Sequence, residues 1–584
     1  MDIQDSRTYS SKEKPWLRYY PEDALQCDVP KVKIYTYLYE CNKNHMDDVA
    51  LLYYGRKITF RRLFEEVDVV AKALVAIGVK RGDIVTLTVP TLPETVYLFF
   101  ALNKLGAVAN SIDPRTNEER LRTYIKNTNS KIVFTIDKYS QVLSRAINGT
   151  DIKQGVIVSA KNSLPCDKKM LYSLVEIAKG FKDKDAVTTK DKRFIMWNQF
   201  VEKGSDIDCV EEAPFEENTP AGIVYTSGTT GIPKGALLSN ENLVAQAINM
   251  KHAVFIKNHG MGLHFLNIMP PWLAYGLTCG LSSILCMGLQ MDMIPKFDYK
   301  KFDKILLEHR PEVILGVPTF FEELIKSKRL VGKNLSFLKI IIVGGSPLNV
   351  GTEEKINQFF EEHNADIKIT KGYGMTEMCA VATYSGKEEY NHYGSVGIPL
   401  VMNNVAVVNP DTGEYCTYNE VGEFYLTGPT RMLGYYNNPS ETAKIFVEKD
   451  GITWVKTGDM GYISENGELF HKSRIKQIMI FEGHNVFGSV IEDVLSQHPM
   501  VAQVAVAGVI YPDSQNCEIP TAFIVLKETT KTKKEIIAEL KELSRQKLPQ
   551  RDVAQDYKIM ESIPLTPVGK VDYEKLRKAE VSAK

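Results

Sequence analysis

The stretch Gly222-Ile-Val-Tyr-Thr-Ser-Gly-Thr-Thr-Gly-Ile-Pro-Lys-Gly235 joins a short apolar run to a loop of glycine, hydroxyl and lysine residues. The apolar run, 222–225, has the length and composition of a buried strand. In the loop, glycines let backbone N–H groups approach a phosphate, hydroxyl groups can donate to it, and Lys234 supplies a cation. The Walker A spacing GxxxxGK[ST] does not occur in the chain. We interpret the stretch as a phosphate-binding loop at the end of a strand; this composition alone leaves an ordinary polar surface turn as the alternative.

Helix and strand patterns alternate on both sides of this loop. Apolar residues from Phe60 to Ile77 recur at helical spacing, with Thr59 before them and Gly78 after them as caps. A second helix can open at Pro93 and end near Gly106. The expected strands are 84–89, 107–112, 131–134, 156–159, 222–225, 312–315 and 338–343. This order predicts an α/β fold with mostly parallel sheets flanked by helices, whose ligand sites lie at the carboxyl ends of strands.

The pattern changes near residue 473. Two β-like runs, 502–510 and 521–526, precede an amphipathic helix that ends at Pro549. Ser489 and Glu492 have capping-box spacing, which predicts that a short helix opens at Ser489. We therefore expect a large N-terminal domain, 1–473, and a small α+β C-terminal domain, 474–584. The segment Lys472-Ser-Arg-Ile-Lys476 is expected to be a polar linker between them.

Composition narrows the functional classes. The 584 residues carry 71 Lys+Arg and 72 Asp+Glu, a formal net charge of −1, which argues against a dedicated nucleic-acid binder. Nine cysteines without a CxxC pair indicate reduced thiols, and the polar start lacks a secretory h-region, so we expect a cytoplasmic protein. The stretch 265–291 has no charged side chain, but prolines and glycines interrupt it. We interpret it as buried core or pocket wall and not as a membrane span.

The eleven-residue string Tyr225–Gly235 resembles the signature of the adenylate-forming superfamily, which includes acyl- and aryl-CoA ligases, luciferase-type enzymes and nonribosomal adenylation domains. Further motifs resemble those of the same family, in family order, from about residue 35 to 578. They are Leu102-Asn-Lys-Leu-Gly-Ala-Val-Ala-Asn-Ser-Ile-Asp-Pro114, Gly344-Gly-Ser-Pro-Leu348, Gly372-Tyr-Gly-Met-Thr-Glu377, Gly422-Glu423, Gly434-Tyr-Tyr436, Thr457-Gly-Asp459, Arg474 and Pro567-Val-Gly-Lys570.

The resemblance implies a nucleotide site for ATP. The loop residues Thr226, Ser227, Gly228, Thr229, Thr230 and Lys234 would hold the β- and γ-phosphates. Tyr373 would lie against adenine, between Gly372 and Gly374 and opposite the turn Gly344, Gly345, Ser346 and Pro347. Asp459 would accept hydrogen bonds from the ribose hydroxyls, and Arg474 would add a contact.

The resemblance also implies catalytic groups. Thr376 would donate to the α-phosphate, and Glu377 with the hydroxyl of Thr226 would hold Mg²⁺, a cation that prefers oxygen ligands. Lys570 would bridge the acid carboxylate and the α-phosphate, where negative charge grows in the transition state. The small domain would be mobile and swing about Lys476. A channel for coenzyme A would include Gly483, His484 and Asn485.

The acid site follows from the same resemblance. Its wall would include Trp272, Leu273, Tyr275, Gly316, Val317, Phe320, Met375 and Met378. Apart from Glu377, the segments that supply this wall contain no charged residue, so an amino-acid ammonium group would lack a partner. We expect an apolar acid, a medium or long fatty acid first and an aryl acid second.

Departures from the family pattern affect the acceptor and the acid. Leu273 stands where many acyl and aryl ligases carry a histidine, and Gln477 replaces a common aspartate after Lys476. Gly488 and Val490 replace a proline and a glutamate of the block that shapes the thiol tunnel. Two alternatives to an acid–CoA ligase stay open: an enzyme that loads the pantetheine thiol of an acyl carrier protein, and a nucleotide-binding protein without catalysis.

Overall fold

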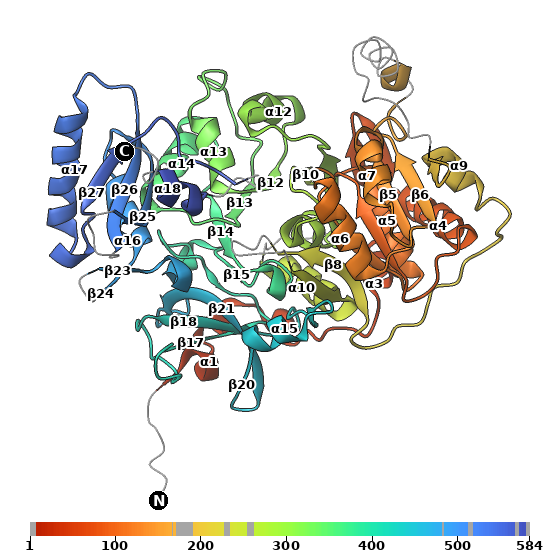
Figure 1. The fold of residues 1–584 in the computed structure, drawn as a ribbon, viewed down its shortest axis with the longest axis horizontal. Coiled ribbons are helices and arrows are strands. Elements are labelled where there is room, and N and C mark those ends of the chain that lie inside the picture. Colours follow the sequence, from red (N-terminus) through yellow and green to blue (C-terminus); the bar gives the residue numbers. More distant parts are fainter. Residues whose placement is uncertain are drawn as a thin grey trace, which may run out of the picture.

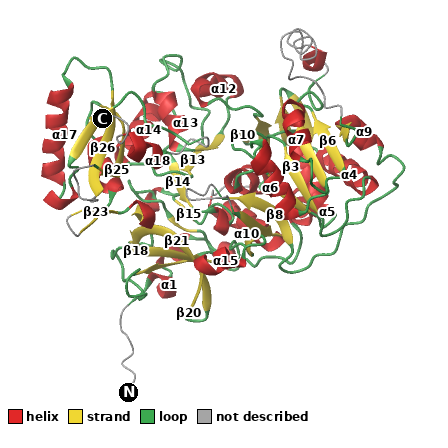
Figure 2. Ribbon diagram, viewed as in Figure 1, coloured by secondary structure: helices red, strands yellow, loops and turns green. Residues whose placement is uncertain are grey.

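The computed structural model describes residues 8–165, 167–170, 191–226, 234–253, 262–481, 484–511, 518–566 and 571–579. Within these residues the chain forms five β-sheets with helices between and around them (Figures 1 and 2). Two of the sheets are large and mostly parallel, and together they form the body of the N-terminal part. The expected α/β class is therefore confirmed.

The first large sheet contains the strand that leads into the phosphate loop. Its strand order is β19-β9-β8-β4-β3-β5-β6-β7, parallel from β8 to β7 and antiparallel at β9 and β19. The strands are β3 (Ile84–Thr88), β4 (Val108–Ser111), β5 (Ile132–Ile136), β6 (Gln154–Val158), β7 (Phe194–Met196), β8 (Pro220–Tyr225), β9 (Gly235–Ser239) and β19 (Gly434–Tyr435).

The second large sheet has the order β16-β15-β14-β13-β12-β10-β11-β1-β2, with parallel pairing from β14 to β1. The strands are β1 (Val49–Tyr53), β2 (Arg56–Thr59), β10 (His264–Asn267), β11 (Gln290–Met293), β12 (Val313–Gly316), β13 (Ile340–Gly344), β14 (Thr370–Tyr373), β15 (Thr383–Tyr384) and β16 (Ile398–Pro399).

Helices cover these sheets, and their starts follow the capping signals in the sequence. The Thr59 hydroxyl accepts from the N–H of Arg62 at the start of α4, and Pro93 opens α5. Ser239 accepts from Asn242 and caps α10. The helices of the N-terminal part include α3 (Ile34–Asn42), α4 (Phe60–Ala76), α5 (Pro93–Lys104), α6 (Glu118–Thr128), α7 (Ser140–Ala146), α9 (Trp197–Glu202), α10 (Asn240–Ala253), α11 (Ser283–Cys286), α12 (Phe302–His309), α13 (Pro318–Ile325) and α14 (Val350–Glu362).

The uncharged stretch 265–291 lies in the core. It forms most of β10, a turn of π-helix labelled η3 (Tyr275–Ser282), α11 and the start of β11. Phe265, Leu281 and Met291 in this stretch are buried in the largest hydrophobic cluster. The expectation of buried core is confirmed, and among the described residues no helix is long and apolar enough to cross a membrane.

An antiparallel sheet follows the two parallel sheets, with the order β17-β18-β21-β20 and β22 beside β21. Its strands are β17 (Asn404–Val408), β18 (Gly422–Thr427), β20 (Phe446–Lys449), β21 (Ile452–Ile463) and β22 (Leu469–Arg474), with α15 (Pro439–Ile445) beside them. The N-terminal helix α1 (Ser10–Glu13) contacts β17, and η1 (Pro15–Tyr19) and α2 (Glu22–Leu25) contribute to the core of this sheet, where Trp16 is fully buried. Residues 472–474 belong to β22, so the prediction of a linker there was wrong: Ser473 pairs with Met460 and Arg474 pairs with Asp459.

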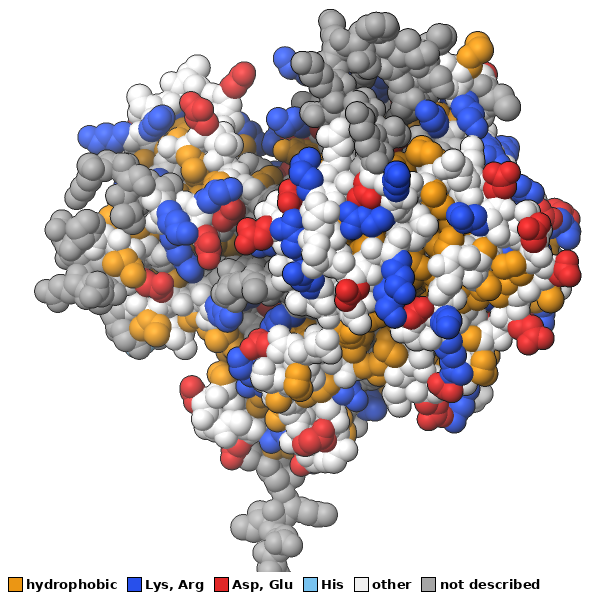
Figure 3. Space-filling model, turned by 45° about the vertical axis from the view of Figure 1, so that its right-hand side comes forward, with side chains coloured by type: hydrophobic (Ala, Val, Ile, Leu, Met, Phe, Trp, Pro, Cys, Tyr) orange, Lys and Arg blue, Asp and Glu red, His pale blue; other side chains and the backbone are white. Residues whose placement is uncertain are grey.

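The remaining elements form the small α+β part at the left of Figure 1. They are η7 (Ile475–Gln477), β23 (Met479–Phe481), β24 (His484–Val486), α16 (Gly488–Ser496), β25 (Val501–Ile510), β26 (Glu518–Leu526), α17 (Lys533–Lys547), η8 (Gln550–Asp552), β27 (Asp556–Ile559) and α18 (Tyr573–Ala579). Figure 3 shows Lys, Arg, Asp and Glu side chains interspersed over one face of the molecule.

The predicted capping box at Ser489 was wrong. The helix α16 begins at Gly488, so Ser489 already lies inside its first turn and donates to the carbonyl of Lys472 instead. Glu492 is buried and accepts hydrogen bonds from the N–H of Val506 and the hydroxyl of Tyr573. A tertiary contact therefore takes the place of the local cap.

Candidate functional site

Strands of both parallel sheets end at the residues predicted to bind nucleotide. Thr226 directly follows β8, Gly344 is the last residue of β13, and Tyr373 is the last residue of β14. The strands β13 and β14 are neighbours, and Gly344 pairs with Gly372. These positions match the rule that ligands bind at the carboxyl ends of parallel strands.

A buried carboxylate forms the centre of the first part of the site. Asp459, on β21, is only 2% exposed, and its carboxylate accepts a hydrogen bond from the Tyr373 hydroxyl at 2.8 Å. Arg474 Nε lies 3.0 Å from its other oxygen, and His471 Nε2 lies 3.5 Å from that same oxygen. Burial alone would raise the pKa of Asp459, but His471, Arg474 and Tyr373 together lower it. The structure therefore brings Tyr373, Asp459 and Arg474 together, as predicted, with Asp459 held as an anion.

The turn after β13 lies near Asp459, because β13 pairs with β14 and Tyr373 at the end of β14 contacts Asp459. Gly345 has φ +79°, which favours glycine, and Ser346 and Pro347 follow it. A Cβ atom on Gly344 would lie 2.9 Å from the Gly372 carbonyl, so only glycine allows this approach of the two strands. The Ser346 hydroxyl is buried, and no hydrogen-bond partner for it is found in the described part of the chain. A buried hydroxyl in this position is a candidate contact for a bound ligand.

The second part of the site lies at the ends of β8 and β9. The N–H of Thr226 donates to the Lys234 carbonyl at 2.9 Å, so the two residues close the base of the loop between them. Ser227, Gly228, Thr229 and Thr230 lie outside the described residues. The Lys234 ammonium lies 3.1 Å from Glu441 and 4.6 Å from the centre of the Tyr435 ring.

Tyr435 connects this lysine to the predicted metal ligand. Its backbone pairs with Ala236 on β9, and its hydroxyl donates to Glu377 Oε1. Glu377 is buried in the short turn η5 (Thr376–Met378), and its backbone carbonyl accepts from Met432 at 2.9 Å. No hydrogen bond to Glu377 Oε2 is found among the described residues. Lys234 and Glu377 therefore contact the same tyrosine from two sides.

The predicted acid pocket is partly assembled. Tyr275, at the start of η3, lies against the turn after β13: a Cβ on Gly344 would be 3.3 Å from its hydroxyl oxygen. Val317 lies beside Gly345, and Gly316 lies beside Phe320. The Tyr275 hydroxyl is buried, and no partner for it is found within the described ranges. Burial raises its pKa well above the ordinary value, so the group is a neutral donor.

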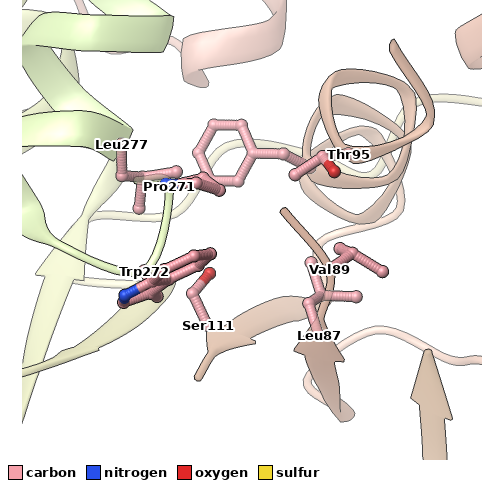
Figure 4. A pocket seen from close by; sticks show the side chains of 8 residues that line it. Leu87, Val89, Thr95, Ser111, Pro271, Trp272 and Leu277 are labelled. Atoms are coloured by element: carbon pink, nitrogen blue, oxygen red, sulfur yellow. The ribbon is translucent and has the colours of Figure 1, made fainter. Parts of the chain in front are cut away.

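Trp272 has different neighbours from Tyr275. It lines a small, mostly apolar cavity with Pro271 and Leu277, shown in Figure 4. The opposite wall comes from the ends of β3 and β4 and from α5, and it consists of Leu87, Val89, Thr95, Phe99 and Ser111. The sequence motifs did not indicate this wall, because only Ser111 lies in a motif compared with the family and no pocket role was assigned to that motif. Leu273 lies beside Trp272 in the turn where its N–H donates to the Pro270 carbonyl.

Met378 is a correction to the predicted pocket. The structure buries it completely in the cluster that contains Trp16, Val405 and Phe424, under the antiparallel sheet. The neighbouring Met375 only packs against that cluster. The short turn η5 directs Glu377 and Met378 to different surroundings, which the sequence pattern does not reveal.

The predicted residues of the small domain lie apart from the groups described above: no hydrogen bond or ion pair joins the two sets among the described residues. Lys476 is exposed in η7, and His484 and Asn485 are exposed on the hairpin β23–β24, which packs against β26 and η8. Gly483 and Lys570 lie outside the described residues.

Three residues of the site were missed by sequence reasoning. His471 and Glu441 carried no signal, because a single histidine or glutamate in a polar stretch is usually exposed. Tyr435 stood in the quoted motif Gly434-Tyr-Tyr436, but only the pairing of β19 with β9 reveals its contact with Glu377.

Comparisons with known proteins cover nearly the whole chain. A family model described as "AMP-binding enzyme" matches residues 38–436, and one described as "AMP-binding enzyme C-terminal domain" matches residues 490–570. The long-chain-fatty-acid–CoA ligase of Bacillus subtilis (strain 168) is 30% identical over 97% of this chain and 98% of its own length. The 4-coumarate–CoA ligase 1 of Arabidopsis thaliana is 27% identical over 88% of this chain and 87% of its own. The crystal structure of ATP-bound MatB from Rhodopseudomonas palustris covers 94% of this chain and 99% of its own, with a TM-score of 0.76 at 22% identity, a likeness of fold.

Proposed function

We propose, from the premise that this chain belongs to the AMP-binding enzyme family, that it is an ATP-dependent acid–CoA ligase. The acid carboxylate attacks the α-phosphorus of ATP, which gives an acyl-adenylate and releases pyrophosphate. The thiolate of coenzyme A then attacks the acyl carbonyl, which gives the thioester and releases AMP.

The observation that carries this proposal is the anionic Asp459 beside Tyr373. A buried carboxylate next to an aromatic ring that ends a parallel strand suits a nucleoside: the oxygens accept from ribose hydroxyls while the ring covers the base. In this proposal Arg474 adds a contact to the nucleotide, and Gly344, Gly345, Ser346 and Pro347 face the base opposite Tyr373.

The phosphates lie, in this proposal, between the base of the loop and η5. Lys234 turns from Glu441 toward the β- and γ-phosphates, and Thr376 donates to the α-phosphate. The donor set fits Mg²⁺, because Glu377 and Thr226 present hard oxygen atoms and Glu377 Oε2 takes no hydrogen bond found in the described chain. When bound, Mg²⁺ would neutralise charge on the leaving pyrophosphate. The Tyr435 hydroxyl orients the Glu377 carboxylate for this task.

The small domain completes each half-reaction in turn. We propose that the small domain moves as a unit about Lys476, which is exposed in the short turn between β22 and β23, while Arg474, paired with Asp459, stays with the large domain. Lys570 supplies the cation for adenylation, and the segment with Gly483, His484 and Asn485 borders the path of coenzyme A. Closure of the site at each step also protects the acyl-adenylate from water.

The acid is apolar, and a fatty acid is the first choice. Two findings support this: the walls near Tyr275, Val317 and Phe320 are uncharged, and the Bacillus subtilis relative bears the name long-chain-fatty-acid–CoA ligase. The buried Tyr275 hydroxyl and the 4-coumarate–CoA ligase relative support an aryl acid as the second candidate.

The described cysteines are all free thiols, which supports a reducing, cytoplasmic setting.

The test is a panel of acids assayed for pyrophosphate release, with and without coenzyme A. Octanoate, palmitate, benzoate, 4-hydroxybenzoate and the twenty amino acids compete, and an acyl carrier protein replaces coenzyme A in a parallel series. We expect fatty acids to give the fastest release and coenzyme A to yield the thioester. A preference for an amino acid, or thioester formation on the carrier protein alone, would contradict the proposal.

A further inference from the structure

The helices α14 and α16 pack against each other and form hydrogen bonds across the boundary between the two proposed domains. α14 belongs to the large N-terminal part, and α16 follows the proposed pivot at Lys476. At one end of the contact, the carboxylate of Asp493 on α16 accepts a hydrogen bond from the N–H of Val350, 3.1 Å away, in the first turn of α14. An anion at the amino end of a helix is favoured by the free N–H groups and the helix dipole.

At the other end of the contact, a cation from α14 reaches the carboxyl end of α16. Lys355 Nζ donates to the carbonyl of Ser496, at 2.8 Å, and to the carbonyl of Val501, at 3.2 Å. Its ammonium thus binds the Ser496 carbonyl at the end of α16, where carbonyl groups lack intrahelical partners, and the Val501 carbonyl at the start of β25. Burial lowers the pKa of Lys355, so the ammonium depends on these acceptors for stabilisation.

The two helices also approach each other closely at Gly351 of α14, which has no side chain. A Cβ atom on Gly351 would lie 2.6 Å from the Ser496 hydroxyl oxygen and 2.7 Å from its carbonyl oxygen, so the contact requires glycine. A further hydrogen bond runs from Gln503 on β25 to Glu322 on α13, at 2.6 Å. These contacts are all between residues before 475 and residues after 477.

We propose that this contact, which we call the α14–α16 catch, holds the small domain in one of its two working orientations. Lys355 and Asp493 are positioning residues in this proposal, which rests on the proposed function. A swing about Lys476 carries Asp493, Ser496 and Val501 away from α14 and breaks the three hydrogen bonds of Val350 and Lys355. The catch therefore sets the balance between the orientation for adenylation and the orientation for thioester formation.

Matched variants separate the catch from a general effect on folding. Lys355→Met keeps the aliphatic length but removes the donor, whereas Lys355→Arg keeps a cation that can reach the carbonyls. Asp493→Ala removes the acceptor, whereas Asp493→Asn keeps an oxygen that can accept from Val350. Lys333→Met, at an exposed lysine, serves as a surface control.

The measurement is the rate of each half-reaction in the full-length protein. Adenylation is followed as palmitate-dependent pyrophosphate release in a single turnover without coenzyme A, and thioester formation is followed from supplied palmitoyl-AMP and coenzyme A. We expect Lys355→Met and Asp493→Ala to change the two rates in opposite directions and to shift their ratio about tenfold, the value of one hydrogen bond to a charged group. Lys355→Arg, Asp493→Asn and Lys333→Met should keep the wild-type ratio.

The outcomes distinguish this inference from the proposed function. If the wild type catalyses both half-reactions and the Met and Ala variants change neither, or reduce both equally, the catch is wrong and the proposed function stands. If the wild type catalyses neither half-reaction with any acid of the panel, the proposed function is wrong and the catch falls with it.

Discussion

Asp459 is the residue that we propose to bind the ribose of ATP. Its carboxylate is shared by Tyr373, Arg474 and His471, and all three lower its pKa against the effect of burial. We predict that Asp459→Asn weakens ATP binding by about 1.5–3 kcal/mol, roughly ten- to a hundredfold, because a charged acceptor is lost. Acid affinity should stay within twofold, as measured by KM for palmitate at saturating ATP. An unchanged KM for ATP in a folded variant would contradict the ribose assignment.

A second buried carboxyl, Glu94 on α5, allows a prediction about pH. It is 1% exposed, and burial raises its pKa from 4.5 to about 7, although the Ser163 hydroxyl donates to it at 2.7 Å. In the unfolded chain the group ionises near pH 4.5, whereas in the folded chain it holds its proton up to about pH 7. The folded state binds more protons in this window, so Glu94 makes stability fall as pH rises through it, by on the order of 3 kcal/mol.

Glu94→Gln should remove this pH dependence, because the amide stays neutral at the same size. We expect the urea midpoint of the variant to exceed that of the wild type at pH 8 and to equal it near pH 4.5. Glu361→Gln, at an exposed position, is the control and should follow the wild type at every pH. Equal midpoints for Glu94→Gln and wild type at pH 8 would show that the carboxyl is not protonated by burial.

At the scale of elements, local signals predicted seven of the seventeen strands of the two large sheets and the ranges of the helices α4 and α5. The helix α4 begins after Thr59 and β3 begins at Ile84, as the apolar spacing and the caps indicated. The two errors lie at the domain boundary. Arg474 is polar because it pairs with the buried Asp459, and Ser473 beside it pairs with Met460 in the sheet. Glu492 accepts hydrogen bonds from Val506 and Tyr573. In both places a long-range contact outweighs a local pattern, which a single sequence does not reveal.

The candidate site divides in the same way. Motifs named Asp459, Tyr373, Lys234 and Glu377, because the family pattern fixes their order along the chain. They did not name His471, Glu441 or the role of Tyr435, since these residues meet their partners only through strand pairing and a neighbouring helix. Met378 was misassigned because adjacent residues of a short turn face different surroundings.

The elements before residue 25 give a prediction about stability. Trp16 is fully buried, and a Cβ on Gly467 would lie only 2.9–3.2 Å from it. Tyr20 donates to the Pro399 carbonyl at 2.9 Å, so the segment is held at more than one point. We predict that Trp16→Ala destabilises the antiparallel sheet by about 3–5 kcal/mol through the cavity it leaves. Calorimetry of the full-length protein should show a lower transition temperature, while Leu25→Ala, at an exposed position, should not.

At the scale of the whole molecule, the chain has a large body and a small part joined by one short turn. Ile475–Gln477 lies between β22, which belongs to the antiparallel sheet, and β23, which belongs to the small part. The residues that we propose to bind nucleotide are all in the body, and the proposed Lys570 and coenzyme A groups are all after the turn. One rotation there can therefore exchange one set for the other.

Lys476→Pro tests that rotation. A proline fixes φ near −65°, which the turn Ile475–Gln477 tolerates in the orientation seen here, and no hydrogen bond from the Lys476 N–H is found among the described residues. The variant should therefore fold, and its melting temperature should match that of the wild type. We predict that it keeps adenylation, measured as acid-dependent pyrophosphate release, and loses thioester formation from supplied acyl-AMP by a factor of about ten or more, because the backbone no longer passes through the φ values that the swing requires. Lys472→Ala, in the paired strand β22, is the control for loss of a nearby charge and should retain both rates. If Lys476→Pro performs both half-reactions at the wild-type rate, the pivot lies elsewhere in the chain or the small domain does not need to turn.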